Sequence, residues 1–395
     1  MKHSIDRCRA GARLPIATLL ASLGFATLPS MLHAAPQTVD VHIRGGTVID
    51  GSGKPGFTAD VLIVGDTITH VGPQRESEVD ARLTIDARGK VVSPGFIDIH
   101  PHSDPVDGSL DNFLAQGITS ILLGQDGRTA GHLNAETPAL EEWRKARARP
   151  DDFAQPVTLE QWMRKVEHRG IRLNVATLVG HGTVRLISGV GSSEAVTESQ
   201  HQAMQEILRG ELDAGAYGMS TGLEYVPGRN ASKDELVRFT KIVGERDGVV
   251  MSHLRSEEGA ATPGAPPDIV LMNEALEELF GYGRHARVHA SHIKVIFGQG
   301  GGAQAHAILE RMREARAAGI QVTADVYPYY AGVSNFYFLY PLWAREKPAF
   351  EQAAANDRNR LAVDMRERIM FRGGPQTALV LDYMEIGRAS CRERV

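Results

Sequence analysis

Two histidines separated by a single residue stand in the segment Asp98-Ile99-His100-Pro101-His102. Alternate side chains of a strand point the same way, so we expect the imidazoles of His100 and His102 to face together. Imidazole nitrogens bind zinc and related divalent ions at neutral pH. Two histidines with ordinary structural roles would explain so short a pattern equally well. The spacing therefore indicates a candidate metal site that needs further ligands.

Two more histidines, His253 and His292, lie at or near the ends of short apolar segments. If these segments are parallel strands of one barrel, their carboxyl ends meet at the same mouth, where barrel active sites assemble. Imidazoles from three strands would then converge on one point, which is a typical environment for a metal ion. The predicted imidazole ligands are His100, His102, His253 and His292.

The elements that must position these histidines follow Pro94. Short apolar segments alternate there with amphipathic stretches of about 10–18 residues, which is the pattern of βαβ units. The predicted strands are 95–100, 120–124, 174–180, 217–221, 249–253, 288–294 and 322–329, and helices are expected at 197–213, 232–246 and 303–318. We predict an α/β fold, a distorted (β/α)8 TIM-like barrel whose last strand is missing. A doubly wound sheet is less well supported, because no G-x-G-x-x-G motif follows the first strand.

The region before the barrel is rich in Val, Ile and Thr and is punctuated by glycine. Three strand-and-turn patterns between residues 39 and 92 predict a small β-domain, half of a β-sandwich. We place this domain at 35–93 and the barrel at 94–384.

The first part of the chain has the pattern of an export signal. Basic residues precede an apolar stretch from Leu14 to Leu28, and small residues surround Ala34. We predict that residues 1–34 are a signal peptide and that the mature protein is periplasmic or secreted. A buried N-terminal helix is the alternative.

The last residues, 385–395, read EIGRASCRERV. This string matches the conceptual translation of a common sequencing adapter. We expect that it is an artefact and that the natural sequence is interrupted near Met384. Of the two cysteines, Cys8 lies in the predicted signal and Cys391 in this tail, so no disulfide is expected.

The bulk composition excludes some classes of partner. A formal net charge of −5 gives no electrostatic reason to expect nucleic acid. No apolar run approaches the roughly 20 residues that a membrane-spanning helix needs. No oligomeric state is predicted.

The motifs resemble those of a known family. Residues 94–102 read PGFIDIHPH, which resembles the PGFID-x-H-x-H end of the first strand in the amidohydrolase superfamily. The resemblance then narrows to the N-acyl-D-amino-acid deacylase (D-aminoacylase) branch. The segments that resemble this branch are GHGTVR (180–185), GMSTGLEYVPG (218–228), SHLRSE (252–257), SHIK (291–294) and DVYPY (325–329).

The resemblance implies a barrel that holds one or two divalent ions, usually Zn²⁺. It implies that His253 and His292 hold one ion, while His100 and His102 belong to the other position. A bridging ligand is expected after the second strand, where this branch often has cysteine and this chain has Asp126. A carboxylate in place of a thiolate favours harder ions, so Mn²⁺ and Co²⁺ are alternatives. An ordinary Asp-Gly turn would also explain Asp126.

The resemblance also implies that Lys294 and Tyr327 bind the carboxylate of the substrate. A further hydroxyl donor is expected where Val333 stands, with Ser334 adjacent. His181 and Arg185 follow the third strand. We expect them to support the metal ligands, to face the substrate, or to anchor a loop. His289, three residues before His292, is expected to face away from the mouth.

The resemblance implies that an aspartate at the end of the eighth strand acts as general base. We find no eighth strand after Tyr329 and do not assign this role to Asp382, so the catalytic residue stays unknown and the 395-residue chain is expected to be inactive. For the full-length parent, we predict metal-dependent hydrolysis of the amide bond of N-acyl-D-amino acids. An isoaspartyl-dipeptidase-like peptidase is an alternative, and so is a non-catalytic metal- or ligand-binding protein. A cyclic-amide hydrolase is a weaker one, because segment 217–221 lacks the lysine typical of that class.

Overall fold

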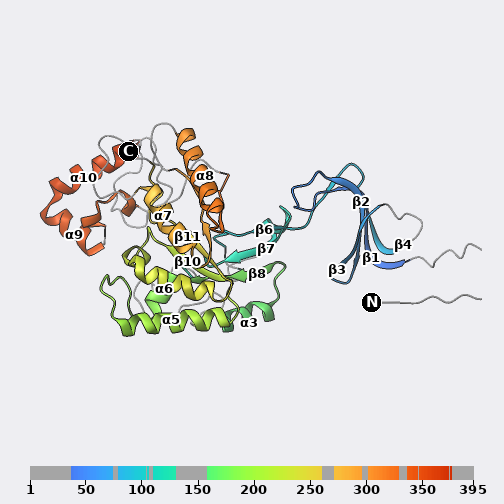
Figure 1. Cartoon of the computed structure of the whole chain (residues 1–395), viewed down its shortest axis with the longest axis horizontal. Helices are drawn as coiled ribbons and strands as arrows, with labels where there is room; N and C mark the ends of the chain where they lie inside the picture. Colours follow the sequence, from blue (N-terminus) through green and yellow to red (C-terminus); the bar gives the residue numbers. More distant parts are fainter. Residues whose placement is uncertain are drawn as a thin grey trace, which may run out of the picture. The chain divides into compact units, whose positions relative to one another are not determined.

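The computed structural model describes residues 37–73, 79–103, 105, 110–129, 158–259, 271–295, 301–328, 336–345, 347–372 and 374–375. The predicted signal peptide, Val333, Ser334, Asp382 and the tail 385–395 lie outside the described residues. The chain divides into two compact units, residues 1–94 and residues 95–395. Figure 1 follows the elements of both units along the chain. Among the described helices, none is long and apolar enough to cross a bilayer.

The first unit contains one five-stranded sheet, a single layer of the predicted half-sandwich. Its strands are β1 (Gln37–Val48), β2 (Phe57–Val64), β3 (Thr67–Gly72), β4 (Val79–Asp86) and β5 (Val91–Val92). Strand β2 is antiparallel to β1 and β3, whereas β4 and β5 run parallel to β1. A buried pair joins two of these strands, since His42 Nε2 lies 2.8 Å from Asp60 Oδ2.

The second unit is built on parallel strands in the order of the sequence. They are β6 (Phe96–Asp98), β7 (Ile118–Leu123), β8 (Asn174–Thr177), β9 (Val179–Gly180), β10 (Gly218–Gly222), β11 (Val249–His253), β12 (Arg287–Ala290) and β13 (Val322–Ala324). Only Leu178 separates β8 from β9, and its amide donates to the carbonyl of Leu123 at 2.9 Å. Strands β8 and β9 are therefore one interrupted strand, which links the sheet β6-β7-β8 to the sheet β9-β10-β11-β12-β13.

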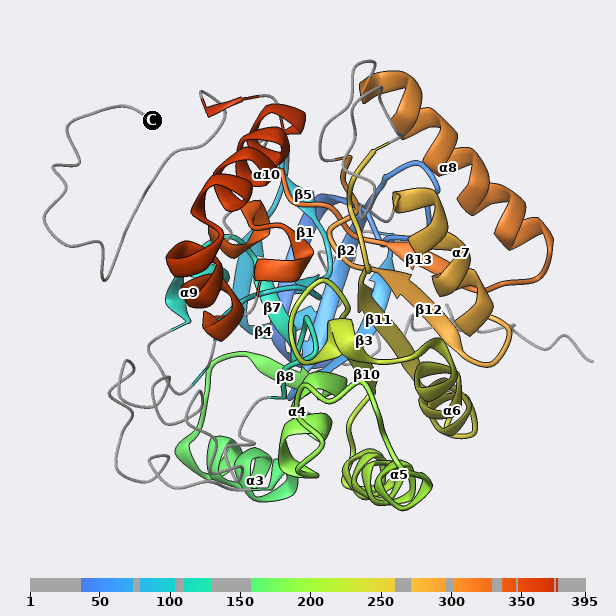
Figure 2. The same ribbon diagram turned by 90° about the vertical axis from the view of Figure 1, so that its left-hand side faces the viewer.

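The described helices of the second unit lie between these strands or after them along the chain. They are α1 (Asp111–Leu114), α3 (Leu159–Arg169), α4 (His181–Ile187), α5 (Glu198–Asp213), α6 (Lys233–Gly244), α7 (Met272–Tyr282), α8 (Gly301–Ala317), α9 (Lys347–Asn356) and α10 (Arg358–Phe371). Short 3-10 helices are η2 (Gly228–Asn230), η3 (Phe336–Leu339) and η4 (Leu342–Ala344). Figure 2 shows α5, α6, α7 and α8 following one another around β10 to β13. Capping boxes at Thr158 and Thr197 fix where α3 and α5 begin.

The core lies between these helices and the strands. Its fully buried members include Met219, Phe239, Val250 and Leu276. The alternation of strands and helices agrees with the predicted barrel type, and all seven predicted strands are present. Among the described residues, the strands do not form a closed barrel. The first and last of these strands are nevertheless linked through a hydrogen bond, because His100 Nδ1 lies 2.9 Å from Asp325 Oδ2. This bond joins the loop after β6 to the loop after β13.

Candidate metal centre

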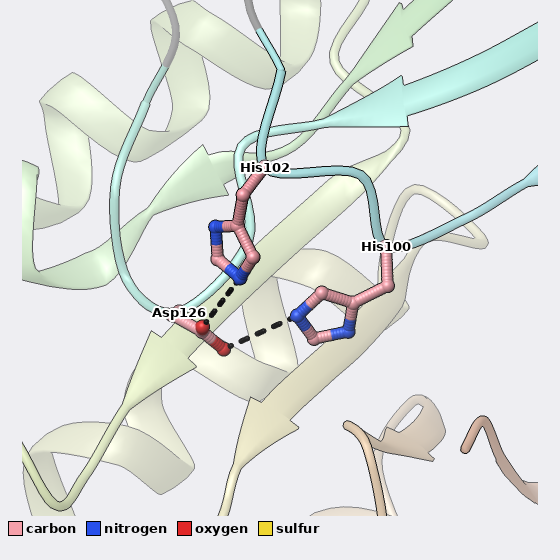
Figure 3. Close-up of side chains that lie close together, drawn as sticks. All are labelled: His100, His102 and Asp126. Atoms are coloured by element: carbon pink, nitrogen blue, oxygen red, sulfur yellow. Dashed lines mark ion pairs between the residues drawn. The ribbon is translucent and has the colours of Figure 1, made fainter. Parts of the chain in front are cut away.

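The carboxylate of Asp126 is surrounded by four imidazoles. Oδ1 lies 3.6 Å from His100 Nε2, 3.7 Å from His253 Nδ1 and 3.6 Å from His292 Nε2. Oδ2 lies 3.2 Å from His102 Nε2. Figure 3 shows His100 and His102 pointing from one loop toward Asp126. The structure thus brings together all five side chains that the sequence predicted as metal ligands.

The strands end earlier than predicted, which corrects part of the sequence argument. Strand β6 ends at Asp98 and β12 ends at Ala290, so His100, His102 and His292 lie in loops. The argument from alternate strand positions was therefore wrong for His100 and His102, and His292 lies beyond its strand rather than near its end. Their loops, and a backbone φ of 33° at His292, bring the rings to Asp126 instead. Only His253 ends its strand as predicted.

The prediction that His289 faces away from the mouth was also wrong. Its Nε2 lies 3.5 Å from Asp325 Oδ2, and its Nδ1 is hydrogen-bonded to Thr323 at 2.7 Å. Since Asp325 also bonds His100, His289 belongs to the groups that surround the site.

A constrained turn presents Asp126 to the histidines. Its backbone φ is 54°, in the left-handed region that residues other than glycine rarely adopt. Gly124 and Gly127 on either side also have positive φ, 84° and 78°. A Cβ atom on Gly124 would lie 2.4 Å from the carbonyl oxygen of Leu178, so only glycine fits there. The unfavourable backbone at Asp126 persists because its neighbours fix it, a feature common at functional sites.

The hydroxyl of Ser220, in β10, holds this turn in place through two hydrogen bonds. Its side chain is fully buried, and its hydroxyl donates to the carbonyl of Gly124. The same hydroxyl accepts from the amide of Gly127 at 3.0 Å. Thr183 adds a bond, because its amide donates to the carbonyl of Gly127 at 3.0 Å. One side chain therefore bridges both flanks of Asp126.

Ser220→Ala should weaken Zn²⁺ binding by about 10- to 100-fold, the loss typical of groups that orient a metal ligand. The unfolding free energy should also fall by about 1–3 kcal/mol, since the amide of Gly127 loses its acceptor. Competition titration with a chelator measures the affinity. Thr240→Val is the matched control, because it removes a buried hydroxyl bonded to Leu236 and should leave Zn²⁺ affinity unchanged. An unaltered affinity in Ser220→Ala would show that the turn does not need this bridge.

The donor atoms fit a cation. Asp126 Oδ1 and His100 Nε2 are buried and, among the described residues, have no hydrogen-bond partner. The ring nitrogens His253 Nδ1 and His292 Nε2 are 2.9 Å apart. Buried polar atoms normally have a partner, so Asp126 Oδ1 and His100 Nε2 require one. The ligand atoms of Asp126, His253 and His292 lie within 4.8 Å of one another, as do those of His100, His102 and Asp126. Imidazole nitrogens and carboxylate oxygens are good ligands of zinc.

Further carboxylates approach the opposite nitrogens of these rings. Glu224 Oε2 lies 3.1 Å from His253 Nε2, and Glu257 Oε1 lies 2.9 Å from His292 Nδ1. Asp325 does the same for His100, as described above. Such carboxylates fix the tautomer and the orientation of a metal-binding ring. Sequence reasoning missed their role, although all three stand in the recognised segments 218–228, 252–257 and 325–329.

The electrostatic field of the site is negative. Burial alone would raise the pKa of Asp126, but the four surrounding imidazoles outweigh it and hold that pKa far below its usual value. Burial disfavours a charged His292, yet Asp126 and Glu257 outweigh burial and raise its pKa to about 9. The site therefore favours positive charge, which a divalent ion supplies in place of protons.

The two predicted substrate-binding residues lie beside the histidines. Lys294 Nζ donates to Glu257 Oε1 and lies 3.1 Å from His292 Nδ1. The ring of Tyr327 is 5.4 Å from Lys294 Nζ and 6.3 Å from the ring of His292. Both side chains are thus close to the cluster, but Lys294 is also engaged by Glu257.

His181 and Arg185 contact a different group. His181 Nε2 lies 2.7 Å from Glu235 Oε1, and Arg185 Nη1 donates to both oxygens of Glu235 at 2.8 Å. All three side chains are buried. These contacts tie α4 to α6 and correspond to the anchoring alternative rather than to a place beside the metal ligands.

The chain is similar to known deacylases. It is 34% identical over 298 residues to the N-acyl-D-glutamate deacylase of Alcaligenes xylosoxydans xylosoxydans, covering 74% of this chain and 57% of that protein. A D-aminoacylase structure matches with a TM-score of 0.62 and 32% identity, over 74% of this chain and 59% of that one. The N-acyl-D-glutamate deacylase of Bordetella bronchiseptica, solved with zinc and a phosphonate inhibitor, matches with a TM-score of 0.59 and 30% identity, with the same coverage. The chain matches no protein-family model.

These similarities confirm the resemblance inferred from the motifs. The matched region takes in three quarters of this chain, but the chain spans less than two thirds of the length of each of these relatives.

Proposed function

We propose that this chain is part of a metal-dependent amidohydrolase that cleaves the amide bond of N-acyl-D-amino acids. The observation that carries this proposal is the convergence of four imidazoles on the carboxylate of Asp126. The similarity to N-acyl-D-glutamate deacylase and D-aminoacylase supports the same chemistry.

In this proposal Asp126, His253 and His292 hold one divalent ion, and His100 and His102 share Asp126 in a second position. Zn²⁺ is the first choice, with Mn²⁺ and Co²⁺ as alternatives, since the described cluster offers oxygen and nitrogen ligands. When bound, such an ion polarises an acyl carbonyl and promotes ionisation of water.

Side chains of this chain bind the substrate and orient the metal ligands. Lys294 and the hydroxyl of Tyr327 donate to the substrate carboxylate, since an ammonium and a phenol are both hydrogen-bond donors to an anionic oxygen. Glu224 and Glu257 hold the rings of His253 and His292 in place. No described residue is assigned as the general base.

We also propose that residues 1–34 export the protein and that the 395-residue chain is a fragment of the enzyme. The export proposal is supported by the basic and apolar pattern before Ala34, and the fragment proposal by the adapter-like string at 385–395. Re-sequencing the 3′ end of the gene tests the second of these. A continuation in frame with a strand that ends in aspartate is the expected result, whereas a stop codon after Val395 would contradict it.

Hydrolysis of N-acetyl-D-methionine by the product of the complete gene tests the proposed activity. We expect turnover with Zn²⁺, loss of turnover after dialysis against a chelator, recovery on adding the ion, and little turnover of N-acetyl-L-methionine. Full activity after the metal is removed and verified absent would contradict the proposal, and so would equal turnover of the L substrate.

A further inference from the structure

The carboxylate of Asp325 contacts two of the loops that carry ligand histidines. Asp325 follows β13, and its Oδ2 lies 2.9 Å from Nδ1 of His100, in the loop after β6. Its Oδ1 accepts a hydrogen bond from the backbone amide of His292, in the loop after β12. In the proposed metal centre His292 belongs to the first ion position and His100 to the second. One carboxylate therefore contacts the ligand sets of both ions.

The backbone of Asp325 also holds the loop that carries His292. The amide of Asp325 donates to the carbonyl of Ala290 at 3.3 Å, and its carbonyl accepts from the amide of Ile293 at 2.9 Å. The backbone φ of His292 is 33°, a conformation that residues other than glycine rarely adopt. Such a conformation persists only where the surroundings fix it. The contacts of Asp325 on both sides of His292 provide that constraint.

The same carboxylate selects the nitrogen of His100 that is available to an ion. An ionised carboxylate only accepts hydrogen bonds, so the proton of a neutral ring lies on Nδ1. The opposite nitrogen, Nε2, keeps its lone pair and faces Asp126 Oδ1 at 3.6 Å. Burial alone would raise the pKa of Asp325, but the imidazoles of His100 and His289 outweigh it and hold that pKa well below its usual value. Asp325 therefore directs Nε2 toward the metal centre.

A third histidine limits the movement of this carboxylate. His289 is buried, and its Nε2 lies 3.5 Å from Asp325 Oδ2. Its Nδ1 is hydrogen-bonded to Thr323 Oγ1 at 2.7 Å, and the two residues are partners in the pairing of β12 with β13. The side chain of Asp325 is thus held by residues of two paired strands as well as by the ligand loops.

We propose that Asp325 is a positioning residue shared by the two ion positions. This inference rests on the proposed function, because it concerns the metal centre on which that function depends. Glu224 provides a contrast, since its carboxylate contacts the ring of His253 at 3.1 Å and so supports the first position. The two oxygens of Asp325 accept from two different donors. An amide of the same shape has one acceptor and can serve only one of them.

Zn²⁺ affinities measured in two variants of the 395-residue chain test this role. His102→Ala disables the second position, and His253→Ala disables the first. Competition with a chelator then gives the affinity of the position that remains. We expect Asp325→Ala to weaken Zn²⁺ binding by about 10- to 100-fold in both backgrounds. Glu224→Gln should weaken it only in the His102→Ala background.

Asp325→Asn separates positioning from a role in folding, and it carries the test if Asp325→Ala does not fold. We expect it to weaken Zn²⁺ binding in at least one background. The visible absorption bands of Co²⁺ bound at saturation should also shift in that background, because a ligand ring or loop is no longer held in place. A role in folding alone would leave these bands unchanged.

Asp364→Asn is the matched control, because Asp364 accepts a hydrogen bond from Trp343 Nε1 at 2.8 Å and should change neither affinity nor spectrum. An unchanged affinity of Asp325→Ala in either background overturns the shared role. Original affinities in Asp325→Asn, or weakened binding with unchanged Co²⁺ bands, also overturn it. All these results leave the proposed function standing. Absence of Zn²⁺ binding by the unmodified chain contradicts the proposed function itself.

Discussion

Asp126→Ala is expected to lower the affinity for Zn²⁺ by more than about 100-fold, beyond the loss typical of groups that only orient a ligand. The reason is that one carboxylate faces all four imidazoles, at 3.2–3.7 Å. Without it, the ligand sets proposed for the two ions, His253 with His292 and His100 with His102, contain no negatively charged ligand. Zn²⁺ titration of the unmodified chain and the variant, in competition with a chelator, measures the change.

Asp126→Cys provides the complementary result. A thiolate is a softer ligand than a carboxylate, so this variant should favour Zn²⁺ over Mn²⁺ more strongly than the unmodified chain does. Asp213→Ala is the control, because Asp213 forms an exposed ion pair with Arg246 and should change neither affinity. Zn²⁺ binding by Asp126→Ala within about tenfold of the original value would show that Asp126 is only a turn residue.

Glu235→Gln is expected to lower the free energy of unfolding by about 3–5 kcal/mol, the cost of breaking a buried ion pair from one side. Arg185 is fully buried and loses the anion that its guanidinium contacts through two bonds, and His181 loses its partner at the same time. Urea denaturation at neutral pH measures the change. Glu160→Gln, which breaks the exposed pair with Arg164, should cost less than about 1 kcal/mol. Similar values for the two variants would contradict this account.

The same network predicts how the stability of the protein changes with pH. Burial alone would raise the pKa of Glu235, but His181 and Arg185 outweigh it and hold that pKa below its usual value. The stabilising contribution of the carboxylate is therefore complete above the usual carboxyl range and is lost as the pH falls through the lowered pKa.

The sequence predicted those parts of the fold that depend on local patterns. Apolar runs such as 249–253 mark buried parallel strands, and β11 begins and ends as predicted. The sequence did not show where β12 ends, because apolar residues recur past Ala290, at Ile293 and Val295, although the pairing with β13 stops at Ala290. That early end is what places His292 in a loop with positive φ, so its ligand geometry required the structure.

The ligand residues could be predicted, but their supporting groups could not. The strand pattern named His253 and the family resemblance named Asp126, whereas the contacts of Glu224 and Glu257 with the ring nitrogens join elements far apart in the chain.

Anomalous X-ray diffraction at the zinc absorption edge, from crystals of the chain grown with Zn²⁺, tests the central claim most directly. The predicted result is an ion about 2.0–2.2 Å from His253 Nδ1, His292 Nε2 and an oxygen of Asp126. An ion bound elsewhere with these three side chains free, or no ion at a saturating concentration of Zn²⁺, would contradict the metal centre on which the proposed hydrolysis depends.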